Sequence, residues 1–253
     1  MEQELKIVIP FYNAESYIEK CLLSVLTQKY DNFHIILIND ASTDKSDEII
    51  QGYLSDKITY IKNETRMGAM YNHQNAVFNF CNPNDIVVQV DGDDMLYNKN
   101  VLSYINDVYY LYDCWMMYGQ AIYSNGRAGN AKPYLSKEEF ENKRNLPFYV
   151  SHIRTFRAFA FHEIKNQDEN LSCFKDESGN WYDMTCDVAM MYPLMEVCGY
   201  ERVFYNSKVL YIYNSDNPIC DYKIDLEKQE RIHKEILNKK PFKQLMYAEG
   251  SIK

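Results

Sequence analysis

The chain has 253 residues, enough for one large α/β domain or for one domain with a modest C-terminal extension. Its formal net charge of -9 argues against a nucleic-acid partner, because that kind of binding depends on clustered Lys and Arg. The apolar runs are shorter than the roughly 20 residues of a membrane span, and the N-terminal stretch is too short and too acidic for a signal peptide. We therefore expect a cytoplasmic protein without an integral membrane segment. The 7 cysteines include no C-x-x-C pair, so neither a structural zinc site nor a disulfide framework is expected.

The N-terminal part of the chain alternates between buried strands and amphipathic helices. Apolar runs predict the strands, and apolar residues three and four apart predict the helices. The predicted strands are residues 5–11, 33–40, 58–62 and 86–90, and the predicted helices are residues 15–28, a short helix opened by residues 42–44, and a helix after Gly68. This order is typical of a mostly parallel α/β sheet with right-handed crossovers and helices on both faces.

Polar side chains follow three of these strands. Tyr12 and Asn13 follow the first strand, Asp40 ends the second, and Asp91 and Asp93 follow the fourth. Ligands of such sheets bind outside the carboxyl ends of the strands, so we expect these residues to meet at one rim.

The acidic turn after the fourth strand is the strongest candidate for a metal site. Gly92 allows the backbone to turn sharply, so that Asp91 and Asp93 can face one crevice. Two carboxylates at this spacing suit a hard divalent cation with oxygen ligands, and that cation would suit a diphosphate. Taken alone, a D-x-D triplet is more often an acidic turn that caps the next helix. Asp94 either faces the second substrate or caps that helix.

The C-terminal part of the chain is less regular. We predict helices over residues 98–112, 152–164, 187–200 and 224–237, and strands over residues 115–124, 201–206 and 208–214. Residues 125–145 have no long apolar period, and a loop of that length is usually a functional lid or a mobile segment. Residues 166–180 are also polar, residues 214–221 are expected to form a turn, and the last dozen residues to be disordered.

Several motifs carry a resemblance to a known family. They occur in the order VIPFYNAESYIEKCLLSVLTQ, ILINDASTD and VDGDD, followed by SHIRTFRAFAF, DVAMMYPLMEVCGY and YIYNSDNP. With these motifs, residues 5–220 resemble the family-two glycosyltransferases of the GT-A fold. The resemblance implies a Rossmann-like, mostly parallel sheet. It also implies helices on both faces of this sheet and a smaller C-terminal region on the acceptor side. The GT-A domain is expected over residues 1–220, with a nucleotide-binding half (1–97) and an acceptor-side half (98–220), followed by a C-terminal helix and tail over residues 221–253.

The resemblance assigns the donor nucleotide to the N-terminal half. Pro10, Tyr12 and Glu15 resemble the pocket for the base, with the Tyr12 ring stacked beside it. Asp40 resembles the carboxylate that accepts a hydrogen bond from the uracil ring N–H, and its position also suits an Asx turn. Arg66 resembles a contact to the base or the phosphates, and a solvated loop arginine is the alternative.

The diphosphate would be held by the acidic turn and by arginines. By resemblance, Asp93 ligates Mn²⁺ or Mg²⁺ between the phosphates, and Asp91 contacts the ribose hydroxyl or reaches the metal through water. Arg154 and Arg157 are three residues apart and so share one face of the predicted helix, where their guanidinium groups would match phosphate oxygens. Surface salt bridging is the alternative for both.

An inverting transfer also needs a general base for the acceptor hydroxyl. The family pattern places this carboxylate at Asp187, with Asp183 in reserve, and the alternative is an Asp favoured by the dipole at a helix start. Cys186 stands where the family more often has Glu. His152 and His162 are further candidate contacts to metal or phosphate.

We therefore expect a metal-dependent, inverting glycosyltransferase that moves a sugar from a nucleotide-diphosphate sugar, a UDP-sugar above all, to a hydroxyl of a glycan or polysaccharide. A nucleotidyltransferase is the enzymatic alternative, but it would normally carry a Gly-rich phosphate loop where this chain has PFYNAES. A third possibility is a non-catalytic sugar-nucleotide-binding protein, against which the filled acidic positions argue. The sequence does not predict the donor sugar, the acceptor, the linkage or the oligomeric state.

Overall fold

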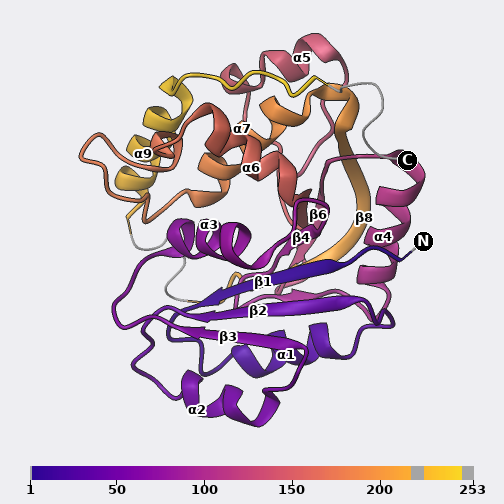
Figure 1. The fold of residues 1–253 in the computed structure, drawn as a ribbon, viewed down its shortest axis with the longest axis vertical. Coiled ribbons are helices and arrows are strands. Elements are labelled where there is room, and N and C mark those ends of the chain that lie inside the picture. Colours follow the sequence, from indigo (N-terminus) through magenta and orange to yellow (C-terminus); the bar gives the residue numbers. More distant parts are fainter. Residues whose placement is uncertain (1, 218–224, 247–253) are drawn as a thin grey trace.

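The computed structural model describes residues 2–217 and 225–246. Its strands form one eight-stranded sheet in the order β3-β2-β1-β4-β7-β6-β8-β5 (Figure 1). The strands are β1 (Leu5–Phe11), β2 (Phe33–Asn39), β3 (Ile58–Lys62), β4 (Ile86–Gln89), β5 (Met95–Leu96), β6 (Met116–Tyr123), β7 (Arg154–Arg157) and β8 (Val203–Tyr213). The pairs among β1 to β4 and the pair β6–β8 are parallel, whereas β7 is antiparallel to β4 and β6, and β5 to β8. The predicted mostly parallel α/β sheet is confirmed.

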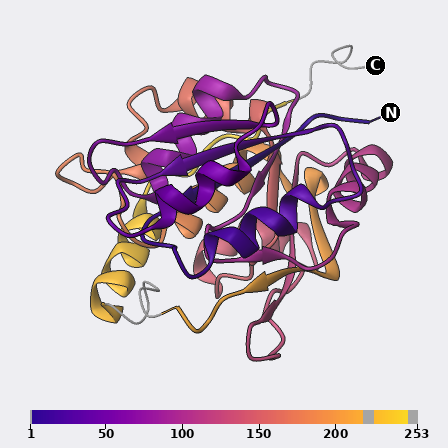
Figure 2. The ribbon, with the colours of Figure 1, turned by 90° about the horizontal axis from the view of Figure 1, so that it is seen from below.

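Helices cover both faces of this sheet, as expected. They are α1 (Ile18–Leu26), α2 (Ser46–Ile50) with η1 (Gln51–Tyr53), α3 (Ala69–Phe80) and α4 (Val101–Tyr112) in the N-terminal part. Leu5, Ile7 and Ile9 of β1 belong to the apolar layer that includes α1 and α4, whereas Val8 belongs to the opposite layer with α3. Strands buried on both faces account for the continuous apolar runs in the sequence. Helices α1 and α2 lie in front of the sheet when it is seen from below (Figure 2).

The predicted helix over residues 152–164 is wrong in its first part. Residues 154–157 form β7, with Arg154 opposite Gln89 and Arg157 opposite Ile86, and α6 (Ala158–Gln167) begins only after it. Because β7 fills the space between β4 and β6, its sheet hydrogen bonds and cross-strand packing outweigh the local helical pattern.

Two predicted loops contain short helices, and two predicted strands are one. The segment 125–145 contains α5 (Lys137–Glu141), capped by the Ser136 hydroxyl, and η2 (Lys143–Asn145). The segment 166–180 contains η3 (Ser172–Phe174). The chain from 203 to 213 is one strand, preceded by η4 (Tyr200–Arg202) and paired irregularly with β6 around Gln120. Parts of the predicted turn at 214–221 and of the last dozen residues, and the boundary between residues 220 and 221, lie outside the described residues.

The C-terminal elements pack on the half of the molecule that carries β6 and β8. Helix α7 (Cys186–Cys198) is almost entirely buried and ends, as predicted, at Gly199, whose φ of 75° suits glycine. Helix α9 (Leu226–Asn238) lies against α7, and the chain beyond it runs back along α7, where Leu245 N–H donates to the Val197 carbonyl at 2.9 Å. These contacts with α9 and with the chain after it hold helix α7 in place.

Candidate active site

The carboxyl ends of β1, β2 and β4 meet at one rim, as the sequence predicts. A cavity of about 240 Å³ is lined there by Pro10, Tyr12, Asp40, Asp91 and Asp93. Gly92 allows the acidic turn to press against β1, because a Cβ at this position would lie 2.4 Å from Phe11 Cβ. We call this cavity the inner cavity.

Asp40 shapes the loop that leads into α3. Its buried carboxylate accepts hydrogen bonds from Met67 N–H at 2.8 Å, Gly68 N–H at 2.9 Å and the Asn63 amide at 2.8 Å. The turn after β2 is made instead by Asn39, whose side-chain oxygen accepts from Ser42 N–H at 2.8 Å. Asn39, and not Asp40, therefore forms the side-chain turn at this position.

Three residues around the inner cavity have defined positions. The Arg66 guanidinium lies 4.2 Å from the centroid of the Tyr12 ring, over its face. Glu15 is exposed and does not line this cavity. Its carboxylate accepts from Lys45 N–H at 3.0 Å, which joins the segment before α1 to the segment before α2. Asn72 of α3 does line the cavity, and its buried Nδ2 has no hydrogen-bond partner among the described residues.

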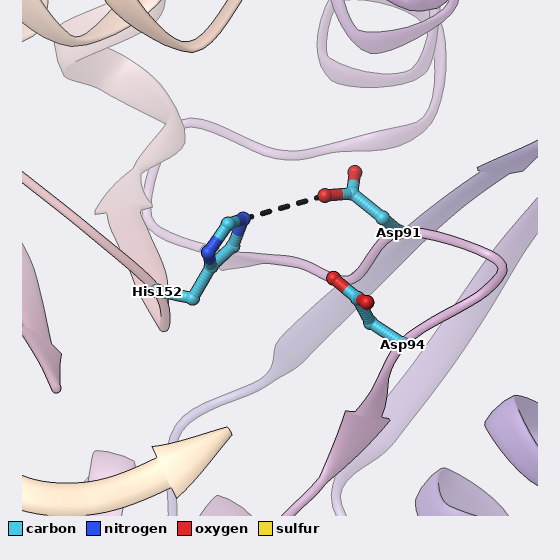
Figure 3. A group of neighbouring side chains, drawn as sticks. All are labelled: Asp91, Asp94 and His152. Atoms are coloured by element: carbon cyan, nitrogen blue, oxygen red, sulfur yellow. Dashed lines mark ion pairs between the residues drawn. The ribbon is translucent and has the colours of Figure 1, made fainter. Parts of the chain in front are cut away.

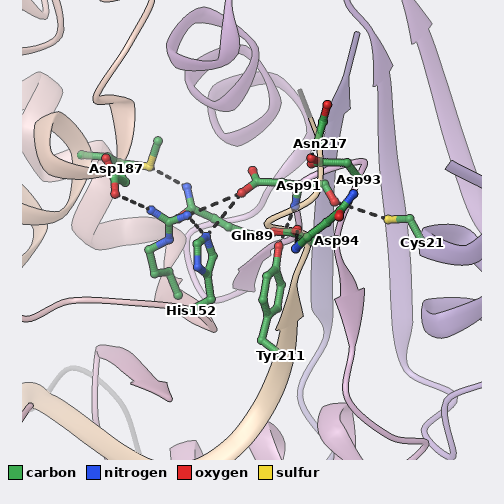
Figure 4. A network of polar contacts seen from close by, with 12 residues as sticks. Cys21, Gln89, Asp91, Asp93, Asp94, His152, Asp187, Tyr211 and Asn217 are labelled. Carbon is green, nitrogen blue, oxygen red and sulfur yellow. Dashed lines mark hydrogen bonds and ion pairs between the residues drawn. The ribbon is translucent and has the colours of Figure 1, made fainter. Parts of the chain in front are cut away.

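Asp91, Asp94 and His152 bring ligand atoms within 4.8 Å of one another (Figure 3). His152 Nε2 lies 3.3 Å from Asp91 Oδ2, and the His152 ring stacks on Tyr211 at a centroid distance of 4.6 Å. The Asp93 side chain points away from this group of three and accepts from the Asn217 amide at 2.6 Å (Figure 4). The structure thus groups Asp91 with Asp94 and His152, whereas the sequence suggested Asp91 with Asp93.

The electrostatics of the acidic turn favour a bound cation. Burial, and then the charges of Asp93 and Asp91, raise the pKa of Asp94 well above its usual value. Although burial opposes ionisation of Asp91, His152 and Arg154 hold the pKa of its carboxyl below the usual range. Asp94 Oδ1 accepts from Asn214 N–H at 2.7 Å, but Oδ2 is buried and has no partner among the described residues. Two carboxylates and an imidazole suit a divalent cation such as Mn²⁺, so these residues fit the metal expected from the sequence.

Arg154 joins the acidic turn to Asp187. Its Nη2 lies 3.6 Å from Asp91 Oδ2 and its Nη1 lies 3.4 Å from Asp187 Oδ2, and it also contacts His152. Asp187 lies in the first turn of α7, half exposed, with Oδ1 accepting from Val188 N–H at 2.9 Å. The bridge belongs to the polar network drawn in Figure 4. The structure therefore brings Asp91, Arg154 and Asp187 together.

Other sequence candidates lie away from this network. Arg157 is at the far end of β7, where it donates to the Asn84 carbonyl at 3.1 Å. The helix that would have aligned it with Arg154 is a strand, so the two side chains point to opposite faces about 10 Å apart along the chain. His162 lies on α6 against Phe78, and Asp183 is ion-paired with Lys228.

Two further cavities continue from the inner one. The middle cavity, of about 170 Å³, is lined by His73, Gln89, Asp91, Arg154 and Asp187 among others. The outer cavity, of about 670 Å³, shares Asp187 with the middle one and is bounded by aromatic and polar residues. Its lining includes Tyr123, Arg127, Phe148, His152 and Tyr213.

Sequence reasoning missed His73 and Gln89. Gln89 is the one polar residue in the apolar run Ile86 to Val90, which was a usable signal for a polar group aimed at a site. His73 carried no such signal, because only the position of α3 turns it inward. Burial lowers the pKa of His73 to about 4, so its ring is neutral at neutral pH.

Residues 6–165 match the sequence model of a family described as Glycosyl transferase family 2. Among curated proteins, the chain is 32% identical over 116 residues to glycosyltransferase GlyA of Streptococcus pneumoniae serotype 4, covering 43% of this chain and 16% of that protein. It is 26% identical over 141 residues to glycosyltransferase GlyG of the same organism, covering 55% of this chain and 46% of that protein. The chain thus spans less than half the length of these relatives.

Solved structures share the fold at low identity. S. aureus TarS residues 1–349 in complex with UDP-GlcNAc has a TM-score of 0.67 and 18% identity, covering 92% of this chain and 65% of that chain. The mannosyltransferase PcManGT from Pyrobaculum calidifontis, in complex with GDP-Man and Mn²⁺, has a TM-score of 0.55 and 16% identity, covering 84% and 57%. Within residues 2–217 and 225–246, none of the helices has the length and apolar character to span a bilayer.

Proposed function

The chain belongs to glycosyl transferase family 2 and has the GT-A fold, and from this premise we propose that it transfers a sugar from a UDP-sugar to a glycan hydroxyl, with inversion and with a divalent metal. The observation that carries the proposal is a set of three adjoining cavities: Asp91 lines the inner and middle ones, Asp187 lines the middle and outer ones, and Tyr213 lines all three. Three adjoining cavities suit a nucleotide, a sugar and an acceptor.

The inner cavity suits the donor nucleotide. Tyr12 offers an aromatic face for stacking, although Arg66 covers a face of that ring and would have to share it or move. Asp40 lies at the cavity wall, and the unpaired Nδ2 of Asn72 is a donor for a phosphate or ribose oxygen. The complexes of fold neighbours with UDP and with UDP-GlcNAc support a UDP-sugar as the donor.

The acidic turn suits the metal. Asp91, Asp94 and His152 would hold Mn²⁺ or Mg²⁺, with Asp93 beside them. Such an ion supplies positive charge to the leaving diphosphate as the glycosidic bond breaks. The stacked ring of Tyr211 and the contact with Asp91 orient His152 toward the turn. The Mn²⁺ complex of a fold neighbour supports a divalent metal in the reaction.

We assign the role of general base to Asp187. It lines both the middle and the outer cavity, so an acceptor hydroxyl entering from the outer side can give its proton to this carboxylate and attack the sugar as the bond to the diphosphate breaks. The guanidinium of Arg154 lies 3.6 Å from Asp91 and 3.4 Å from Asp187, and so holds both carboxylates in the lining of the middle cavity.

The outer cavity suits a glycan acceptor. Tyr123, Phe148 and Tyr213 offer ring faces for the apolar side of a sugar, and Asn125 and Asn130 offer amides for hydroxyl groups. The Arg127 guanidinium lies 4.1 Å from the Tyr123 ring centroid, which fixes one wall of this cavity.

A direct assay tests the proposal. The protein is incubated with UDP- or GDP-sugars, glycan acceptors and Mn²⁺ or EDTA, and we expect release of UDP from a UDP-sugar that depends on the metal. The same ligands should raise the melting temperature, because they bind the native state. Release of pyrophosphate from a nucleoside triphosphate, or binding of UDP without any turnover, would contradict the proposal.

A further inference from the structure

Three residues that line the middle cavity each have a buried polar atom without a hydrogen-bond partner among the described residues. These atoms are His73 Nδ1, Gln89 Oε1 and Arg154 Nε. The three residues are 4%, 4% and 6% exposed. A buried polar atom without a partner costs about 1–3 kcal/mol, so three of them around one cavity indicate a site that a ligand completes.

The middle cavity is too large for a single water molecule, and it lies between the acidic turn and Asp187. Its volume is about 170 Å³, whereas one water takes up about 30 Å³ in the liquid. Asp91 borders it toward the inner cavity and Asp187 toward the outer cavity. A group bound here would therefore lie between the acidic turn and the base.

The charge of the cavity argues against a phosphate. Asp91 and Asp187 both border it, and Arg154 is already within 3.6 Å of Asp91 and 3.4 Å of Asp187. No net positive charge is left for an anion. A neutral ligand that both donates and accepts hydrogen bonds is the better match.

Hydroxyl groups have this double capacity. Gln89 Oε1 can accept a hydrogen bond, because its amide Nε2 is directed at Met190 Sδ. Arg154 Nε can only donate, and the neutral ring of His73 can do either at Nδ1. A polyhydroxylated ring can satisfy all three atoms at once, whereas a simple apolar group satisfies none of them.

We propose that His73, Gln89 and Arg154 form the subsite for the transferred sugar and select it through its hydroxyl groups. The inference rests on the proposed function and assigns the middle cavity within it. His73 and Gln89 are specificity-determining residues on this account, since Arg154 also holds the two carboxylates. Replacement of either should change sugar recognition while the inner cavity keeps its nucleotide.

The test compares each nucleotide sugar with its free nucleoside diphosphate. Wild-type protein, Gln89→Met and His73→Leu are titrated with UDP-glucose, UDP-galactose, UDP-N-acetylglucosamine and GDP-mannose, and with UDP and GDP, all with Mn²⁺. For the best wild-type donor we expect each variant to weaken nucleotide-sugar binding about tenfold, as the loss of one or two hydrogen bonds implies. Binding of the free diphosphate should stay within about twofold, and the order of kcat/KM among the sugars should change.

A matched control separates this effect from the loss of any buried histidine. His162 also has a buried ring nitrogen without a partner among the described residues, but it lies on α6 outside the three cavities. His162→Leu should change neither affinity nor donor preference. Gln89→Asn, which keeps an amide but shortens it, serves as a second variant if Gln89→Met does not fold.

The outcomes distinguish this inference from the proposed function. If the variants bind UDP and the UDP-sugar with equally reduced affinity, or if neither affinity changes, the sugar subsite is overturned and the nucleotide site is not affected. Failure of the wild-type protein to bind any nucleoside diphosphate would overturn the proposed function and the subsite with it.

Discussion

Asp94 is the most deeply buried carboxylate of the acidic turn, at 1% exposure, and the contacts that hold it could not be predicted from its neighbours in the sequence. Its Oδ1 accepts from Asn214 N–H, which is 120 positions away in the chain. His152 reaches the same cluster from the segment before β7. A D-x-D pattern predicts that carboxylates gather at a strand end, but such distant contacts decide which of them face one another.

Replacement of Asp94 tests the cluster. Asp94→Asn should weaken Mn²⁺ binding by about tenfold or more, because it removes one of the two carboxylates from the ligand group. In EDTA the variant should be at least as stable as the wild type, since a raised pKa marks a carboxyl whose charge is disfavoured there. Mn²⁺ titration and thermal melting in EDTA measure both effects. Asp56→Asn, at an exposed turn, is the control, and an unchanged Mn²⁺ affinity in Asp94→Asn would exclude Asp94 from the cluster.

Gly92 offers a second test at the residue scale. In Gly92→Ala the added Cβ would lie 2.4 Å from Phe11 Cβ and 3.2 Å from the Pro10 carbonyl oxygen, so the turn must move away from β1. We expect a loss of about 1–3 kcal/mol in the free energy of unfolding and weaker Mn²⁺ binding. Urea unfolding compares it with Gly52→Ala, whose new Cβ meets no atom within 4 Å. Equal stability of the two variants would show that the close approach is not required.

At the scale of elements, sequence patterns identified the type of most segments and misassigned β7. Residues 152–164 contain apolar residues at a helical spacing, yet residues 154–157 pair with β4 and β6. The antiparallel insertion depends on a gap in the sheet that local patterns do not describe. The same error placed Arg157 beside Arg154, whereas alternation along a strand separates them.

A buried ion-pair group ties α7 to the C-terminal elements. Glu196 of α7 is 8% exposed, its Oε1 lies 2.6 Å from Arg144 Nε and 4.0 Å from Lys143 Nζ, and its Oε2 accepts from Phe242 N–H at 3.0 Å. These contacts join η2, α7 and the chain after α9, and α7 carries Asp187. The position of the candidate base thus depends on packing far from the cavities.

Glu196→Ala should lower the free energy of unfolding by about 3–5 kcal/mol, because it leaves buried cations without their partner. Glu201→Ala is the matched control, since its ion pair with Lys137 is 3.5 Å long and both side chains are 56% exposed. Glu201→Ala should lower the free energy of unfolding by less than about 1 kcal/mol. Chemical denaturation measures both variants, and similar losses would mean that the buried group does not hold α7.

At the scale of the whole molecule, the alternating order of strands and helices was sufficient to predict the parallel half of the sheet and its rim. Tyr12, Asp40 and Asp91 meet there because parallel strands end on one side. The cavities beyond Asp91 were not predictable, since their walls come from α3, β7, α7 and the segment after β6. The lining residues that neighbouring cavities share, Asp91 and Asp187, are the basis for assigning the three cavities to nucleotide, sugar and acceptor.

We propose that Asp187 takes the proton from the acceptor while the acidic turn holds the donor diphosphate. The most direct measurement is sugar transfer by Asp187→Asn with a UDP-sugar, an acceptor and Mn²⁺, beside the affinity for UDP. We expect kcat to fall by about 10²–10⁴-fold with the Kd for UDP within about twofold, and Asp183→Asn, whose carboxylate pairs with Lys228, to behave as wild type. Unchanged transfer by Asp187→Asn would contradict the account.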